Sequence, residues 1–304
     1  MTNKEECPAG CVLRLFGAPE QTVQKAVEAL PDTWQGTVHC RSRGAETLVA
    51  LQSSTPQQLH RAVQLLRTSL APALYGEGEQ TLAAAAVQAL VQHRKLLVCS
   101  DAAAGMLLES RLENLSGAEK VFDFGAMSYA NTALTARLSR KLRKAPQAEP
   151  ARTLARVQTM QRLTGAALAV GCVELPQSRL LLVGGKKGCW LRCTAMDENP
   201  GLWLLDMLRR AACGLPQAGG TNWQPYGRAV PDAALTPAAL AAEQSASPRP
   251  KHHRLGKALV VLLLLALAAL AAGWYYTGGD LAALPQKLQS LGAESLPHAG
   301  AKLV

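Results

Sequence analysis

The amino-acid sequence predicts an α/β protein: a small α+β domain, a second domain in which strands and helices alternate, a linker and one transmembrane helix. The chain has 304 residues, of which 48% are apolar, so at ~150 residues per domain it can form about two cores. Within residues 12–212, short apolar runs typical of strands alternate with segments of helical periodicity. That alternation indicates sheets covered by helices.

The small α+β domain is expected at residues 1–78. The order of its segments, β-α-β-β-α, predicts a single sheet with its helices on one face. Thr55 followed by Pro56 marks the start of the second helix, because proline is favoured at the first helical position. Residues 75–79 have the glycine and charge content of a connector. The expected strands are 12–16, 37–41 and 46–52, and the expected helices are 21–30 and 55–70.

The second domain, residues 79–213, is organised around the stretch 95–134. After a helix at 81–94 and a strand at 95–100, we expect a helix that Gly105 opens and Gly117 ends, because glycine tolerates the left-handed conformation at a helix C-terminus. A strand at 121–128 would then deliver Tyr129 and Asn131 to its C-terminal end. Ligands bind at that end of the strands in open α/β sheets, so this stretch has the form of a binding site.

The remainder of this domain ends in a glycine-rich hairpin and a helix. The turn at 184–188 has the sequence GGKKG, but it lacks the spacing and the following Lys-Ser/Thr of a phosphate loop, so we interpret it as a plain turn. Residues 214–256 are rich in small residues and proline without a sustained period, which predicts a flexible linker. The other expected elements are a helix at 151–163, strands at 165–173, 179–183 and 189–194, and a helix at 201–212.

The formal net charge of +10 comes largely from residues 137–156 and 249–257. We interpret the cluster at 137–144 as a solvated helix face; contact with phosphate or nucleic acid is the alternative, although no aromatic residues are interleaved to stack on bases. Eight cysteines are present without the CxxC or Cys/His spacing of a metal site, so we expect reduced thiols in a cytosolic domain. No cofactor and no metal site are predicted, although Cys7/Cys11 and Cys189/Cys193, each at a spacing of four, are weak metal candidates.

A membrane helix is predicted from Ala258 to Tyr276. These 19 residues carry no charge and would span roughly 28 Å as a helix, enough for a bilayer core. Trp274 and two tyrosines lie at one end and the basic residues 249–257 at the other, which places the N-terminal domains in the cytoplasm by the positive-inside rule. We therefore expect a single-pass protein of the cell membrane, with a helix at 257–277 and a short extracytoplasmic tail at 278–304.

Residues 12–208 resemble the C-terminal two-thirds of the CinA family of competence/damage-inducible proteins. Three motifs carry the resemblance: LRLFG with the later YGEGEQTL, which looks like the family's small KH-type middle domain; GMLLESRLENLSGAEKVF, similar to its glycine-led helix and PGS-x-VF loop; and SYAN, similar to Y-S-N-E-A-K. The resemblance implies the nicotinamide-nucleotide amidase fold, an α/β/α sandwich that is commonly oligomeric and hydrolyses nicotinamide mononucleotide to nicotinic acid mononucleotide and ammonia. A pyridine nucleotide is thus the implied ligand, and a homo-oligomer the implied assembly.

The chain departs from the family where the resemblance places catalysis. The family's A-E-S-C-T-G-G turn supplies a serine nucleophile, which the lysine of Y-S-N-E-A-K activates. When the sequences are aligned on Gly105, Asp101 stands at the serine position, Ala104 at a glycine and Leu134 at the lysine. An unassisted serine needs an adjacent base, and leucine cannot supply one.

A shift of one residue would make Ser100 the nucleophile, with Asp101 beside it. Adjacent residues of a strand point to opposite faces, so we expect this pairing to be geometrically poor. The missing base would then have to come from Lys186 or Lys187 in the hairpin turn.

Three hypotheses follow. The leading one is a membrane-tethered, catalytically degenerate CinA-like protein that acts as a binding or interaction module, with a nucleotide held near Gly105, Tyr129 and Asn131. The second is an active nicotinamide-nucleotide amidase with a rearranged site that uses Ser100 or Asp101. The third is a membrane-tethered nucleic-acid-binding protein, which is disfavoured because residues 12–70 contain no GxxG loop of the kind a KH module uses.

Overall fold

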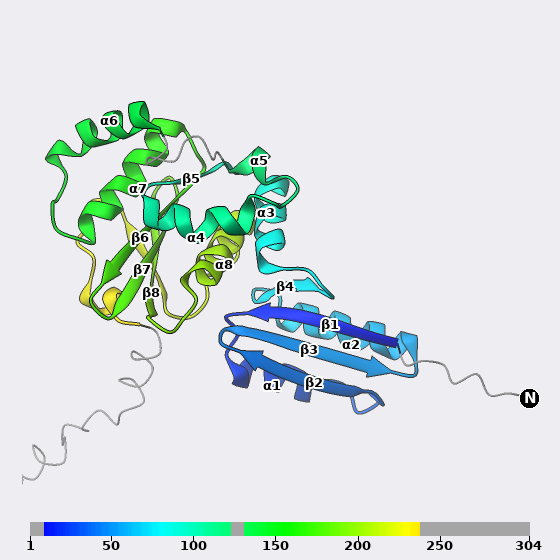
Figure 1. Ribbon diagram of the computed structural model, residues 1–304. Coiled ribbons are helices and arrows are strands. Elements are labelled where there is room, and N and C mark those ends of the chain that lie inside the picture. The colour runs from blue at the N-terminus through cyan, green and yellow to red at the C-terminus, as the bar shows by residue number, and fades with distance from the viewer. Residues whose placement is uncertain (1–8, 123–130, 238–304) are drawn as a thin grey trace, which may run out of the picture. The chain divides into compact units, whose positions relative to one another are not determined.

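A computed structural model describes residues 9–122 and 131–237. All of them belong to one compact unit, Met1–Gln244. They form a four-stranded sheet, a five-stranded sheet and the helices that cover them (Figure 1). The predicted α/β class is therefore confirmed for this part of the chain.

The first sheet is antiparallel, with the strand order β2-β3-β1-β4. Leucine and valine side chains alternate along its central strands, and those of one face pack with both helices in a common apolar cluster. The predicted β-α-β-β-α order is present, but residues 75–79 are more than a connector, because part of them forms a short edge strand paired with β1. The elements are β1 (Ala9–Phe16), α1 (Glu20–Glu28), β2 (Thr37–Arg43), β3 (Glu46–Ser53), α2 (Pro56–Ser69) and β4 (Leu74–Glu77).

The second sheet has the order β5-β6-β7-β8-β9, with β5 and β6 parallel and the other pairs antiparallel. Helices lie on both of its faces: α3, α4 and α8 on one, α6 and α7 on the other (Figure 1). The strands are β5 (Leu97–Cys99), β6 (Leu168–Leu175), β7 (Ser178–Gly184), β8 (Gly188–Ala195) and β9 (Thr221–Pro225). The helices are α3 (Leu82–Gln92), α4 (Ala102–Leu112), α5 (Ala118–Val121), α6 (Thr132–Lys141), α7 (Ala151–Thr164) and α8 (Pro200–Cys213), with 3-10 turns η2 (Leu142–Lys144) and η3 (Asp232–Leu235).

Side chains along β6 explain why this sheet needs cover on both faces. Leu168, Val170 and Cys172 belong to the apolar cluster on the α4 and α8 side, whereas Ala169 and Val173 belong to the cluster on the α7 side. Successive residues of a strand point to opposite faces, so a strand that is apolar throughout is buried from both sides.

Three sequence expectations change in this region. Gly105 does not open α4; the helix begins three residues earlier, at Ala102, because the Asp101 side chain caps it. Gly117, with φ +88°, precedes α5 rather than ending α4. The predicted linker also contains structure, since β9 pairs with β8 and the Trp223 ring packs edge-on against that of Trp190 at a centroid distance of 4.6 Å.

A buried ionic cluster on α8 connects the two sheets of the compact unit. The Asp206 carboxylate is 0% exposed and accepts hydrogen bonds from Arg209 at 2.8 Å and from Arg210 at 2.6 Å. Burial lowers the pKa of Arg210, which its contact with Asp206 partly offsets. The two guanidinium groups also donate to main-chain carbonyls next to the first sheet, at Phe16, Pro72 and Leu74.

No helix among the described residues is long and apolar enough to cross a membrane. The predicted anchor at 258–276 and the tail at 278–304 lie outside the residues that the structure describes. Of the strand predicted at 121–128, Val121 instead ends helix α5, Phe122 forms an isolated parallel bridge with Leu97, and the remaining residues lie outside the described part.

Candidate functional site

A cavity of about 440 Å³ opens beyond the C-terminal end of β5. Its wall is built by the turn from β5 into α4, by one side of α6, by η2 and by the first half of α7. The sequence analysis expected the ligand at the end of the strand predicted at 121–128, most of which lies outside the described residues; of the stretch 95–134, Ser100, Asp101 and Ala102 line this cavity. The lining residues are Ser100, Asp101, Ala102, Thr135, Leu138, Ser139, Leu142, Arg143, Gln147, Arg152 and Arg156.

Ser100 and Asp101 form a buried hydrogen-bonded pair in this wall. Ser100 Oγ donates to Asp101 Oδ2 at 2.9 Å, and the two residues are 0% and 8% exposed. Asp101 Oδ1 accepts from the backbone N–H of Ala104 at 2.8 Å, which caps α4. Oδ2 also accepts from the N–H of Cys172 on β6, at 3.2 Å. Both carboxylate oxygens of Asp101 thus hold backbone in place.

The expectation that Ser100 and Asp101 point apart is wrong. β5 ends at Cys99, and Asp101 already has the extended N-cap conformation of α4, with φ −151° and ψ 163°. The alternation of side chains applies only within a strand, so it does not separate two residues that lie in the turn after it.

Opposing effects act on the Asp101 carboxyl. Burial raises its pKa above the usual range, because a charge is poorly solvated inside the protein. The hydrogen bonds from Ala104, Ser100 and Cys172, and the positive charge of Arg156, lower the pKa without cancelling the effect of burial.

The other predicted site residues do not join this pair. Gly105 is buried within α4, and the Asn131 side chain caps α6 by accepting from the N–H of Leu134 at 2.9 Å. Neither residue lines the cavity, and Tyr129 lies outside the described residues. Leu134, at the position of the family's lysine, is 8% exposed and packs in the apolar cluster beneath α7.

The hairpin lysines do not supply the missing base. Val98 of β5 is in register with Ala169 of β6, which pairs with Gly184 at the end of β7. The turn that follows Gly184 therefore continues beyond the N-terminal end of β5, whereas Ser100 follows its C-terminal end. Lys186 and Lys187 are absent from the cavity lining, and the turn is closed by a backbone hydrogen bond from Gly185 to Gly188 at 2.8 Å, as a plain turn requires.

Three arginines complete the cavity wall, and the sequence interpretation missed their role. Arg143 comes from η2, while Arg152 and Arg156 are one turn apart on α7. Only Arg143 belongs to the cluster at 137–144 that we interpreted from the sequence as a solvated helix face, with phosphate or nucleic-acid contact as the alternative. The spacing of Arg152 and Arg156 was the only available signal, because proline residues separate them from Arg143 in the sequence and only the fold brings the three together.

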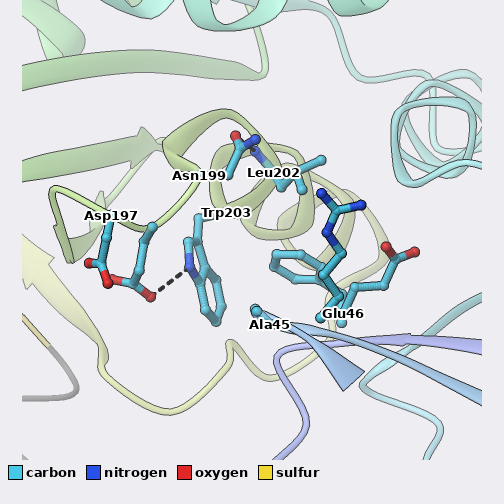
Figure 2. A pocket seen from close by; sticks show the side chains of 10 residues that line it. Ala45, Glu46, Asp197, Asn199, Leu202 and Trp203 are labelled. Atoms are coloured by element: carbon cyan, nitrogen blue, oxygen red, sulfur yellow. Dashed lines mark hydrogen bonds between the residues drawn. The ribbon is translucent and has the colours of Figure 1, made fainter. Parts of the chain in front are cut away.

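A second cavity, of about 520 Å³, lies between the β2–β3 turn and the start of α8 (Figure 2). Both of its glutamates, Glu46 and Glu198, are engaged in local structure. Glu198 accepts from Trp203 Nε1 at 2.9 Å and from the N–H of Ala195 at 2.7 Å, and Glu46 accepts from Arg14 and Tyr75. We therefore regard the cavity beside Asp101 as the better candidate for ligand binding.

Among the described residues, no group of three or more His, Cys, Asp or Glu side chains is placed to hold a metal ion. The described cysteines are free thiols, and burial raises the pKa of Cys189 and Cys193, which disfavours the thiolate form that binds metals.

Comparison with known proteins points to CinA-like relatives. No family model matches the chain. The chain is 30% identical over 133 residues to a CinA-like protein of Desulfovibrio desulfuricans. The aligned region covers 42% of this chain and 31% of that protein. It is 26% identical over 136 residues to proteins from two strains of Clostridium perfringens that carry the competence-damage inducible name, over 43% of this chain and 33% of theirs. The match spans about a third of the length of these curated relatives, and it supports the resemblance to CinA proteins that the motifs indicated.

Proposed function

We propose that this chain is a CinA-related, catalytically degenerate protein whose cavity beside Asp101 binds a pyridine nucleotide without hydrolysing it. The geometry of Asp101 is the observation that carries this proposal. The residue aligned with the nucleophilic serine serves as a helix cap and as a backbone acceptor, with Ala104 at 2.8 Å and Cys172 at 3.2 Å. A carboxylate held in this way is part of the framework of the site.

The absence of a base supports the same proposal. Leu134 aligns with the activating lysine and is packed in the core. Within the described cavity wall, no lysine or histidine lies beside Ser100, and its hydroxyl donates to a carboxylate that already accepts two backbone N–H groups. Serine needs an available base to attack an amide.

The experiment is to incubate the full-length chain, purified in a mild detergent, with nicotinamide mononucleotide, and to follow both thermal unfolding and ammonia release. We expect stabilisation without ammonia. A ligand at 100 times its Kd stabilises by about 2.7 kcal/mol, which corresponds to a rise in Tm of roughly 5–10 °C for a chain of this size. Sustained ammonia release would contradict degeneracy, and the absence of any shift would contradict nucleotide binding.

One observation favours an active amidase as the second candidate. Ser100 Oγ lies 2.9 Å from Asp101 Oδ2, within the reach of a nucleophile and base. If Ser100 and Asp101 form a working dyad, ammonia release is present in the wild-type chain and is lost in Ser100→Ala. We place this candidate second, because the same carboxylate is engaged with the backbone of α4 and β6.

We further propose that residues 258–276 anchor this domain to the cytoplasmic membrane. The support is the sequence: 19 uncharged residues flanked by a basic stretch and an aromatic end. In fractionated cells the full chain should stay in the membrane pellet after carbonate extraction, and a chain that lacks residues 245–304 should not. Release of the full chain by carbonate would contradict the anchor.

A further inference from the structure

The three arginines of the cavity beside Asp101 are not held in ion pairs within the described part of the chain, although the charge of Arg156 acts on Asp101. Among the residues that the structure describes, neither Arg143, Arg152 nor Arg156 forms an ion pair with an acidic side chain. Glu149, just before α7, is the nearest acid in the sequence, and its carboxylate accepts from the N–H of Thr153 at 3.1 Å and does not line the cavity.

The balance of charge in the cavity therefore favours an anion. Asp101 is the only acidic residue in the lining, against three arginines. It belongs to the end of the cavity formed by β5 and α4, whereas the arginines come from η2 and α7. Guanidinium groups suit phosphate better than other cations do, because each offers several N–H donors in one plane.

The neutral groups and the volume fit a small phosphorylated molecule. Thr135, Ser139 and Gln147 line the same cavity and provide hydroxyl and amide groups for hydrogen bonds to oxygen atoms. About 440 Å³ lies within the range of roughly 300–1,000 Å³ that small-molecule pockets occupy.

From this arrangement we infer that Arg143, Arg152 and Arg156 form a binding site for a phosphate monoester. The phosphate lies against the arginines, and the rest of the ligand extends toward Ser100 and Asp101. This inference rests on the proposed function, which places the ligand in this cavity. It adds that the ligand is recognised through its phosphate, which residues of α7 and η2 hold. A nucleoside that lacks the phosphate is then a poor ligand.

The test measures binding by isothermal titration calorimetry on the full-length chain, with inorganic phosphate as the probe, followed by nicotinamide mononucleotide and nicotinamide riboside. Replacement of both Arg152 and Arg156 by glutamine should weaken phosphate binding by about 100-fold or more, because each charge-assisted hydrogen bond that is lost weakens binding by about tenfold or more. The riboside should bind more weakly than the mononucleotide by a similar factor.

The matched control is Arg162→Gln, on the same helix but exposed and outside the cavity lining. Its phosphate affinity should stay within about a factor of two of the wild-type value, because a charge away from the site is screened at physiological ionic strength. Far-UV circular dichroism of each variant separates a loss of binding from a loss of fold.

The outcomes separate this inference from the proposed function. Arginine-dependent binding of inorganic phosphate supports the phosphate site even if the mononucleotide does not bind, in which case the nucleotide proposal fails alone. Binding of the mononucleotide with equal affinity in the wild-type chain and in the variant that lacks Arg152 and Arg156 overturns the phosphate site and leaves nucleotide binding intact. Failure of inorganic phosphate to bind, or equal losses in Arg162→Gln, also overturns it.

Discussion

Asp101→Ala tests whether this residue is part of the framework, as its contacts indicate. The substitution removes the cap from α4, which costs about 0.5–2 kcal/mol, and leaves the buried N–H of Cys172 without its partner, which costs about 1–3 kcal/mol. We expect a total loss of about 2–4 kcal/mol in the free energy of unfolding, allowing for partial relaxation of the backbone.

The assay is equilibrium unfolding in urea followed by tryptophan fluorescence, with Asp101→Asn as the matched variant. Asparagine caps helices about as well as aspartate, so the bond to Ala104 is retained. The side-chain amide of asparagine has only one oxygen, which accepts from Ala104. Its NH₂ group then faces the N–H of Cys172, and two donors cannot form a hydrogen bond. The asparagine variant should therefore lie between the wild-type chain and the alanine variant. A loss below about 0.5 kcal/mol for alanine, the level of an ordinary surface change, would refute the framework role.

The stability of the wild-type chain relative to Asp101→Asn should also depend on pH. Burial raises the pKa of Asp101 above its unfolded value of ~3.9, so the folded state holds this proton more tightly than the unfolded chain does. The contribution of Asp101 to stability is therefore greatest below pH ~3.9 and is lost as the pH rises through the raised pKa. The stability of the wild-type chain relative to Asp101→Asn should fall over that range. A relative stability that rises with pH would show that hydrogen bonds, rather than burial, dominate this carboxyl.

Two further substitutions test how the site is held. Asp206→Ala should destabilise the chain by about 3–5 kcal/mol in urea unfolding, because it leaves the buried cations of Arg209 and Arg210 without their carboxylate; a loss under 1 kcal/mol would argue against this buried cluster. Gly171→Ala should cost about 1–3 kcal/mol and weaken phosphate binding, because its Cβ would lie 2.8 Å from Val157 Cγ2 on α7 and 3.0 Å from Ser100 Oγ. A Gly171→Ala variant with the Tm and phosphate affinity of the wild-type chain would contradict that close packing.

The apolar periodicity in the sequence was sufficient to predict most of the fold, and the exceptions have physical causes. β4 was taken for a connector because its sequence, LYGE, contains glycine and charge; it is an edge strand that depends on pairing with β1. β9 lies in a stretch whose composition is typical of a linker, and it is a strand because it pairs with β8. Pairing between strands distant in sequence leaves no local pattern, so both were missed for the same reason.

In the site, too, local sequence patterns were predictable and contacts between distant residues were not. The location of Ser100 and Asp101 after β5 was predictable, because a short apolar run followed by a turn and a helix is a local pattern. Their hydrogen bond was not, since it depends on where β5 ends, and the role of Asp101 as an acceptor depends on Cys172, 71 positions away. The arginines of α7 and η2 reach the cavity only because α7 crosses the face of the sheet beside β5 and β6. The alignment with the CinA motifs compares the chain only at the positions where the resemblance places catalysis. The fold adds a cluster of positive charge that this alignment does not examine. A measurement of phosphate affinity therefore tests a part of the site on which the alignment is silent.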